Sequence, residues 1–130
     1  LRRGVGDLSP KFGCGQGACG ACTVTIDGVP HLSCLVLAET VQGRAIGTAA
    51  GLAKGPVLDP LQEAFMDRFA AQCGYCTPGM LVSARALLDR NPHPTRDEVI
   101  EAISGNLCRC TGYEPIIAAI LDVAEGRVKA

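Results

Sequence analysis

The sequence predicts an α+β fold, in which a strand-rich part up to about residue 51 precedes a part with four helices. Glycines and alternating β-branched residues dominate the first part, whereas apolar residues three and four positions apart dominate the second. The eight cysteines divide equally between the two parts. We therefore expect two domains, residues 1–51 and 57–130, joined by the short linker GLAKGP.

The expected strands lie close together in the first domain. Residues 22–26, CTVTI, alternate and are rich in β-branched side chains, and Asp27 and Gly28 then give a turn signal. The chain continues as VPHLSCLVL over residues 29–37, so the two runs predict a hairpin. Residues 44–48, RAIGT, predict another short strand.

Four helices are expected after the linker. Thr77 is expected to cap the second helix, with Pro78 at its first position. Residues 95–98, TRDE, have the sequence of a capping box ahead of the third helix. The apolar repeats that indicate the helices are Leu61, Phe65 and Phe69, then Leu81, Ala84 and Leu88, then Val99, Ile100 and Ile103, and finally Ile116, Ile117, Ile120, Leu121 and Ala124.

Charge and composition exclude several classes of protein. The 12 basic and 13 acidic residues give a net charge of −1, so no basic surface for nucleic acid is expected. No apolar run reaches the roughly 18 residues that a membrane span needs. The sequence also has no glycine-rich dinucleotide motif, no P-loop and no nucleophile beside a base, so it has no recognisable motif for binding flavin or nicotinamide.

The cysteines are the candidate metal ligands. They form two sets of four, Cys14, Cys19, Cys22 and Cys34, and then Cys73, Cys76, Cys108 and Cys110. An even count also permits four disulfides, but disulfide-dense proteins are usually too small to build a core. Because this chain has enough apolar periodicity for a core, two centres with four cysteine ligands each are the better interpretation.

The first set has the spacing C-x₄-C-x₂-C-x₁₁-C, and its first three cysteines follow the plant-type [2Fe–2S] pattern. Structural zinc sites usually take their ligands as two short pairs instead. The glycines between the cysteines permit positive φ angles, through which backbone N–H groups can point at an anionic cluster. A glycine-rich turn beside a zinc site is the alternative.

The second set has the spacing C-x₂-C-x₃₁-C-x-C, which by itself fits zinc or a cluster equally well. Cys73 and Cys76 directly precede the helix expected at Thr77, and Cys110 precedes the helix expected in TGYEPIIAAI. Two helix N-termini directed at one anionic centre would stabilise it. This context favours an iron–sulfur cluster.

Three stretches in this order, KFGCGQGACGACTV, QCGYCTPGM and GNLCRCTGY, resemble the two-cluster iron–sulfur subunit of molybdenum hydroxylases. This is the family of xanthine dehydrogenase, aldehyde oxidase and carbon monoxide dehydrogenase, and the resemblance covers nearly the whole chain. It implies a plant ferredoxin-like β-grasp domain followed by an all-α four-helix domain, each with one [2Fe–2S] cluster. It also implies a large partner subunit that carries a molybdopterin cofactor, and often an FAD-binding subunit or another electron acceptor.

The resemblance assigns roles to further residues. Gln72 matches a position that hydrogen-bonds the pterin, and Cys110 matches the last ligand, whose neighbourhood also touches the pterin. In the family, electrons pass from molybdenum through the helical-domain cluster, then through the ferredoxin-type cluster, to flavin or another acceptor. Family members usually begin with a hairpin and a helix before Leu1, so we expect the sequence to be a fragment of a longer chain. The cytoplasm is the expected compartment, with the periplasm as the alternative.

Two other classes of function stay open at this point. A free-standing ferredoxin-type carrier would normally be acidic and would not need the second domain, whereas this chain is nearly neutral. A zinc-binding interaction module would have no redox role, and it would be colourless, whereas iron–sulfur clusters are red-brown. Neither the substrate nor the final electron acceptor is determined by these residues.

Overall fold

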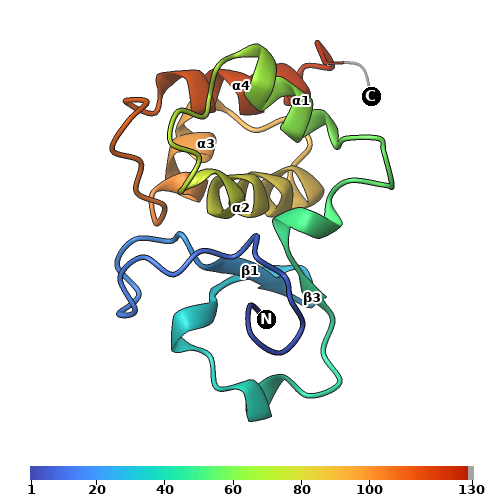
Figure 1. The fold of residues 1–130 in the computed structure, drawn as a ribbon. Helices are drawn as coiled ribbons and strands as arrows, with labels where there is room; N and C mark the ends of the chain where they lie inside the picture. The colour runs from blue at the N-terminus through green and yellow to red at the C-terminus, as the bar shows by residue number, and fades with distance from the viewer. Residues whose placement is uncertain (129–130) are drawn as a thin grey trace.

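The computed structural model describes residues 1–128 and separates strands from helices along the chain (Figure 1). The strands are β1 (Thr23–Ile26), β2 (Val29–Leu32) and β3 (Ile46–Gly47), and the helices are α1 (Pro60–Asp67), α2 (Thr77–Arg90), α3 (Arg96–Ile103) and α4 (Glu114–Ala124). Three short 3₁₀ turns, Ser33–Leu35, Ala38–Val41 and Ala49–Gly51, lie between the strands and α1. The α+β class and the four helices are therefore confirmed.

The sheet is antiparallel throughout, with the strand order β2-β1-β3. Asp27 and Gly28 both have positive φ angles, 49° and 81°, as a two-residue hairpin turn requires. The second strand is shorter than the run of residues 29–37 that was expected to form it, because β2 ends at Leu32. The amide and hydroxyl of Ser33 both donate to the Cys22 carbonyl, at 3.3 and 2.8 Å, and this turns the chain out of the sheet.

The third strand is also shorter than expected, since only Ile46–Gly47 of residues 44–48 pair with β1. The Arg44 amide donates to the Val41 carbonyl at 3.1 Å, which holds residue 44 in a turn. The Ala45 amide donates to the Asp27 carboxylate at 2.9 Å instead of to a neighbouring strand. Because the Asp27 side chain accepts a hydrogen bond from the Ala45 amide, the strand begins only at Ile46.

The helices form the main hydrophobic core. α1 packs against α4, and α2 packs against α3 and also directly against β1 (Figure 1). α2 is therefore covered on two sides, and most of its residues are buried. The largest completely buried side chains are Leu61, Met80, Val99, Ile116 and Ile120 in the helices and Val24 in the sheet. Burying each side chain of this size contributes about 1.5–3 kcal/mol, so this core stabilises the packing of the helices.

The helix ends confirm some of the expected caps and correct others. Thr95 forms the expected capping box with Glu98. Thr77 is not an N-cap: Cys76 occupies that position, and the buried Thr77 hydroxyl has no hydrogen-bond partner among residues 1–128. Phe69 does not continue the apolar repeat, because α1 has ended before it. It has a φ of +51° and is 83% exposed.

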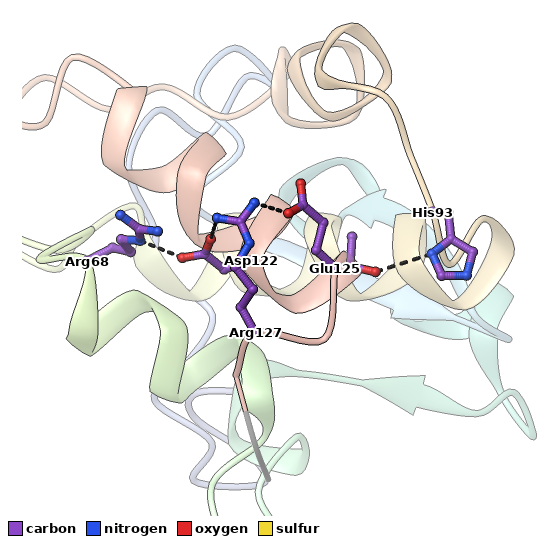
Figure 2. Close-up of polar contacts among 6 residues, drawn as sticks. Arg68, His93, Asp122, Glu125 and Arg127 are labelled. Carbon is purple, nitrogen blue, oxygen red and sulfur yellow. Dashed lines mark hydrogen bonds and ion pairs between the residues drawn. The ribbon is translucent and has the colours of Figure 1, made fainter.

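A polar network ties the end of α1 to the end of α4 (Figure 2). The buried Asp122 carboxylate accepts hydrogen bonds from Arg68 and, at 2.8 Å, from Arg127. Arg127 also pairs with Glu125, and the His93 ring lies 3.2 Å from the Ala124 carbonyl oxygen. The hydrogen bond from Arg68 keeps the pKa of Asp122 below its ordinary value.

No helix within residues 1–128 is both long and apolar enough to cross a membrane.

Candidate metal centres

The first cysteine set lies in the glycine-rich loop before β1 and in the 3₁₀ turn after β2. Cys14 Sγ accepts hydrogen bonds from the Ala18 amide at 3.2 Å and from the Gln16 amide at 3.5 Å. The Gln16 amide and the nearby Cys19 thiol lower the pKa of Cys14 to about 6. The loop therefore favours the thiolate, which is the form of cysteine that binds metal.

Glycines make this loop geometry possible. Gly15 and Gly17 have φ angles of +68° and +79°, which favour residues without a Cβ atom. A methyl group added at Gly13 would lie only 2.8 Å from Cys19 Sγ. The backbone thus approaches the thiols as closely as a cluster-binding loop must.

The hairpin brings the other two cysteines of the first set together. Cys22 is buried directly before β1, and Cys34 lies in the 3₁₀ turn that follows β2. Ser33, which bonds to the Cys22 carbonyl, fixes the start of that turn. Burial and the neighbouring Cys22 thiol raise the pKa of Cys34. A nearby cation would favour the thiolate form of such a thiol, and iron would supply that positive charge.

The second cysteine set comes from the two loops that precede α2 and α4. Its four members line a single cavity of about 200 Å³, together with Cys19 of the first set. Burial, followed by the neighbouring Cys108 thiol, raises the pKa of Cys76 to about 12. Only α2 follows its ligands directly, because Thr111, Gly112 and Tyr113 separate Cys110 from the start of α4. Both helices nevertheless begin where they were expected, α4 at Glu114 within TGYEPIIAAI and α2 immediately after Cys76.

The thiols act on one another in pairs. Hydrogen bonds between thiols shift the pKa values within the pairs Cys14 and Cys19, Cys22 and Cys34, Cys73 and Cys110, and Cys76 and Cys108, and neighbouring thiols of the same set add smaller electrostatic effects across these pairs. A structural zinc ion needs all four ligands around one point, whereas a [2Fe–2S] cluster divides four cysteines between two irons. The donor set therefore fits a [2Fe–2S] cluster better than zinc.

Two tyrosines hold the cysteine loops in place. The Tyr75 hydroxyl donates to the Phe12 carbonyl at 2.6 Å and so connects the loops of the two sets. The Tyr113 hydroxyl accepts from the Cys108 amide at 3.0 Å. The sequence placed both tyrosines beside cysteines, but their hydrogen bonds could be found only in the folded chain.

Gln72 and Cys110, the residues that the family resemblance assigned to pterin contact, lie at the open side of the second set. Gln72 is exposed and directly precedes Cys73, which is also exposed. Cys110 is exposed as well, whereas Cys76 is buried. The outer edge of the second set is thus accessible to another molecule, and its inner edge faces the protein.

Comparison with known proteins matches this architecture. A family model described as a [2Fe-2S] binding domain matches residues 48–121, and one described as a 2Fe-2S iron-sulfur cluster binding domain matches residues 4–68. The chain is 56% identical over 118 residues to the nicotine 6-hydroxylase small subunit of Paenarthrobacter nicotinovorans, covering 91% of this chain and 70% of the relative. It is 46% identical over 124 residues to the xanthine dehydrogenase iron-sulfur-binding subunit of Escherichia coli O157:H7, covering 94% and 78% respectively.

Solved structures of known proteins have the same fold as this chain. The structure of quinoline 2-oxidoreductase from Pseudomonas putida 86 is similar, with a TM-score of 0.93 and 55% identity over 97% of this chain and 79% of the other. The aldehyde oxidoreductase of Desulfovibrio desulfuricans is similar with a TM-score of 0.94 and 43% identity, over 98% of this chain and 14% of that one.

Fold and cysteine sets together define an electron-transfer protein built from two [2Fe–2S]-binding domains. More narrowly, the chain belongs to the family of iron–sulfur subunits of molybdenum hydroxylases. It is therefore part of an oxidoreductase whose substrate site lies on another chain.

Proposed function

We propose that each cysteine set holds one [2Fe–2S] cluster and that this chain relays electrons between the two. The geometry of the cysteines carries the proposal: the four of the second set line one cavity, and backbone amides of the glycine-rich loop bond to Cys14 in the first set. The proposed ligands are Cys14, Cys19, Cys22 and Cys34 for the first cluster, and Cys73, Cys76, Cys108 and Cys110 for the second. When bound, each cluster supplies a one-electron redox centre, while the amides of Gln16 and Ala18 stabilise the thiolate charge.

We further propose that residues 1–51 and 57–130 are the two domains, each with its own cluster. All ligands of the first set precede residue 51 and all those of the second follow residue 57. The matched family regions, residues 4–68 and 48–121, overlap around this linker. Ala49 and Leu52 pack on the helical core, which explains why a sharp boundary is absent there.

Metal analysis of the native complex tests the ligand sets. Two complete sets predict about four iron atoms and four sulfides per chain, two of each per cluster. Cys19→Ser should remove the electron paramagnetic resonance (EPR) signal of the first cluster and leave the second, because the ligands of the second set all lie in the other domain. Ala18→Ser adds a hydroxyl beside that ligand without removing a thiol, and it should keep both signals. About two iron atoms in the wild type would contradict the proposal.

The proposed partner is a large subunit that carries a molybdopterin cofactor, contacted by Gln72 and by the surroundings of Cys110. Exposure of both residues at the open side of the second set supports this contact. The same surface includes exposed Leu107, which a docked subunit would cover. Electrons would then enter at the second set and leave from the first.

Replacing Gln72 tests the contact with the pterin. Gln72→Ala keeps every cysteine, so the iron content should stay normal. Loss of a hydrogen bond in a dry interface costs roughly 1–3 kcal/mol, so molybdenum occupancy or the rate of cluster reduction by substrate should fall. Gln42→Ala removes another exposed amide, 30 positions before Gln72 in the sequence, and is the matched control. Unchanged molybdenum content and unchanged turnover in Gln72→Ala would show that this residue does not touch the cofactor.

We propose that the acceptor beyond the first set is an FAD-binding subunit or another redox partner, and that the complex resides in the cytoplasm. Eight free cysteines are compatible with a reducing compartment, where cluster assembly takes place. Fractionation with analysis of bound flavin in the native complex tests both statements. A complex recovered only from the periplasm would contradict the proposed compartment. A complex without flavin would show that the acceptor is a different redox partner.

A further inference from the structure

A buried amide, Asn106, lies two residues before Cys108 and bonds to three separate parts of the chain. Asn106 is 3% exposed. Its Nδ2 donates to the Gly20 carbonyl at 2.9 Å and to Thr23 Oγ1 at 3.1 Å, and its Oδ1 accepts from the Ser83 hydroxyl at 2.8 Å. An amide side chain has two donor hydrogens and an acceptor oxygen, and all three groups are engaged here. Asn106 therefore joins α2, the loop of the second set and the loop of the first.

Two glycines let these backbones meet. A methyl group at Gly20 would overlap the Gly105 carbonyl oxygen, and one at Gly79 would overlap the Gly20 carbonyl oxygen. Gly20 lies between Cys19 and Cys22, and Gly79 lies in the first turn of α2, three residues after Cys76. The loop of the first set is thus packed backbone to backbone against the loop that precedes Cys108 and against the first turn of α2.

One hydrogen bond beside Asn106 connects residues of the two sets. The Leu107 amide donates to the Cys19 carbonyl at 2.9 Å. Leu107 is the residue directly before Cys108. The backbone of Cys19 in the first set is therefore connected to that of Cys108 in the second set through one hydrogen bond and one intervening residue. Cys19 also lines the cavity formed by the second set. The loops of the two sets are therefore in direct contact at this junction.

We propose that Asn106 is a positioning residue for electron transfer between the two clusters, a statement that rests on the proposed ligand sets. By fixing Gly20 and the segment before Cys108, it holds the Cys19–Leu107 hydrogen bond and the separation of the two sets. With both clusters bound, one electron would pass from the second-set centre, which would be oxidised, to the first-set centre, which would be reduced. No bond forms or breaks, and no proton moves. The partner subunit's oxidation of substrate supplies the electron, and the redox partner at the first set removes it.

The test compares Asn106→Ala with wild type in the assembled enzyme. Iron and molybdenum contents should match those of wild type, and dithionite should still reduce both clusters. The magnetic splitting between the two reduced clusters in EPR, which depends on their separation, should decrease. Stopped-flow absorbance after rapid mixing with substrate should show slower electron transfer between the clusters. Asn91→Ala, the same substitution at the C-terminal end of α2, should leave both quantities unchanged.

Ser83→Ala provides a milder variant, because it removes only the hydroxyl that orients the Asn106 amide. If Asn106→Ala does not retain both clusters, Ser83→Ala becomes the test of the proposal. It should show a smaller magnetic splitting between the two reduced clusters than wild type, with full iron content. Unchanged splitting and unchanged transfer rate in either fully loaded variant overturns the proposal. Loss of a cluster in Ser83→Ala also overturns it, because a positioning role leaves the ligand sets intact. Incomplete iron loading of the wild type would refute the ligand sets instead, so the two failures are distinguishable.

Discussion

Replacing Asp122 by Asn should loosen the contact between α1 and α4. The Asp122 side chain is 9% exposed and accepts hydrogen bonds from Arg68 and Arg127, which are themselves 45% and 54% exposed (Figure 2). Hydrogen bonds to a charged group contribute about 1.5–3 kcal/mol when dry, and exposed ion pairs only about 0.2–1 kcal/mol. Since the carboxylate is buried and its partners are half in water, we expect a loss of about 1–2 kcal/mol, or about 5- to 30-fold in the opening equilibrium.

Native-state hydrogen exchange of the α4 amides in the assembled enzyme measures this loss. Exchange in α4 should accelerate by the same factor in Asp122→Asn. Glu114→Gln breaks the pair between Glu114 and Arg96, in which both side chains are about half exposed or more, so it should have a smaller effect. Equal exchange rates in wild type and Asp122→Asn would refute the reasoning that this network stabilises the helix contact.

The same network makes a prediction about pH. The pKa of Asp122 is lowered in the folded chain, chiefly by the hydrogen bond from Arg68, so its contribution is present above the unfolded pKa of about 4. The contribution is lost as the pH falls through the lower folded pKa. The stability difference between wild type and Asp122→Asn should therefore shrink on acidification below about pH 4. A difference that stays constant down to the acid transition would contradict this assignment.

Two further substitutions probe the helix ends. Thr95→Ala removes the capping box of α3 and should destabilise it by about 1 kcal/mol, seen as faster exchange of the first α3 amides; unchanged exchange would show that the cap is dispensable. Phe69→Gly should slow exchange at the end of α1, because Phe69 has a φ of +51° and a left-handed conformation costs a residue with a Cβ atom about 1–2 kcal/mol. Faster exchange in Phe69→Gly would mean that contacts of the exposed ring outweigh this backbone strain.

The cysteine sets, the helices and their order along the chain follow from local patterns in the sequence. Apolar residues at helical spacing predicted all four helices, because each helix buries one face and its period is readable without knowing its partner. The capping box at Thr95 was predictable for the same reason, since both of its hydrogen bonds lie within four residues. The lengths of the strands were not predictable in this way. The Ser33 hydroxyl donates to the Cys22 carbonyl and the Asp27 carboxylate accepts from the Ala45 amide, and these hydrogen bonds between distant residues end the strands early.

Sequence spacing alone brings together the thiols of C-x₄-C-x₂-C in the first set, and those of C-x₂-C and of C-x-C in the second, because each group lies within one loop. The pairing of Cys22 with Cys34 and of Cys73 with Cys110 was decided only by the tertiary structure, because a hairpin and a helical core must fold before these thiols meet. Asn106 looks in the sequence like an ordinary polar residue. Its role depends on Gly20, 86 positions away, and contacts at that separation exist only when α2 has packed against β1.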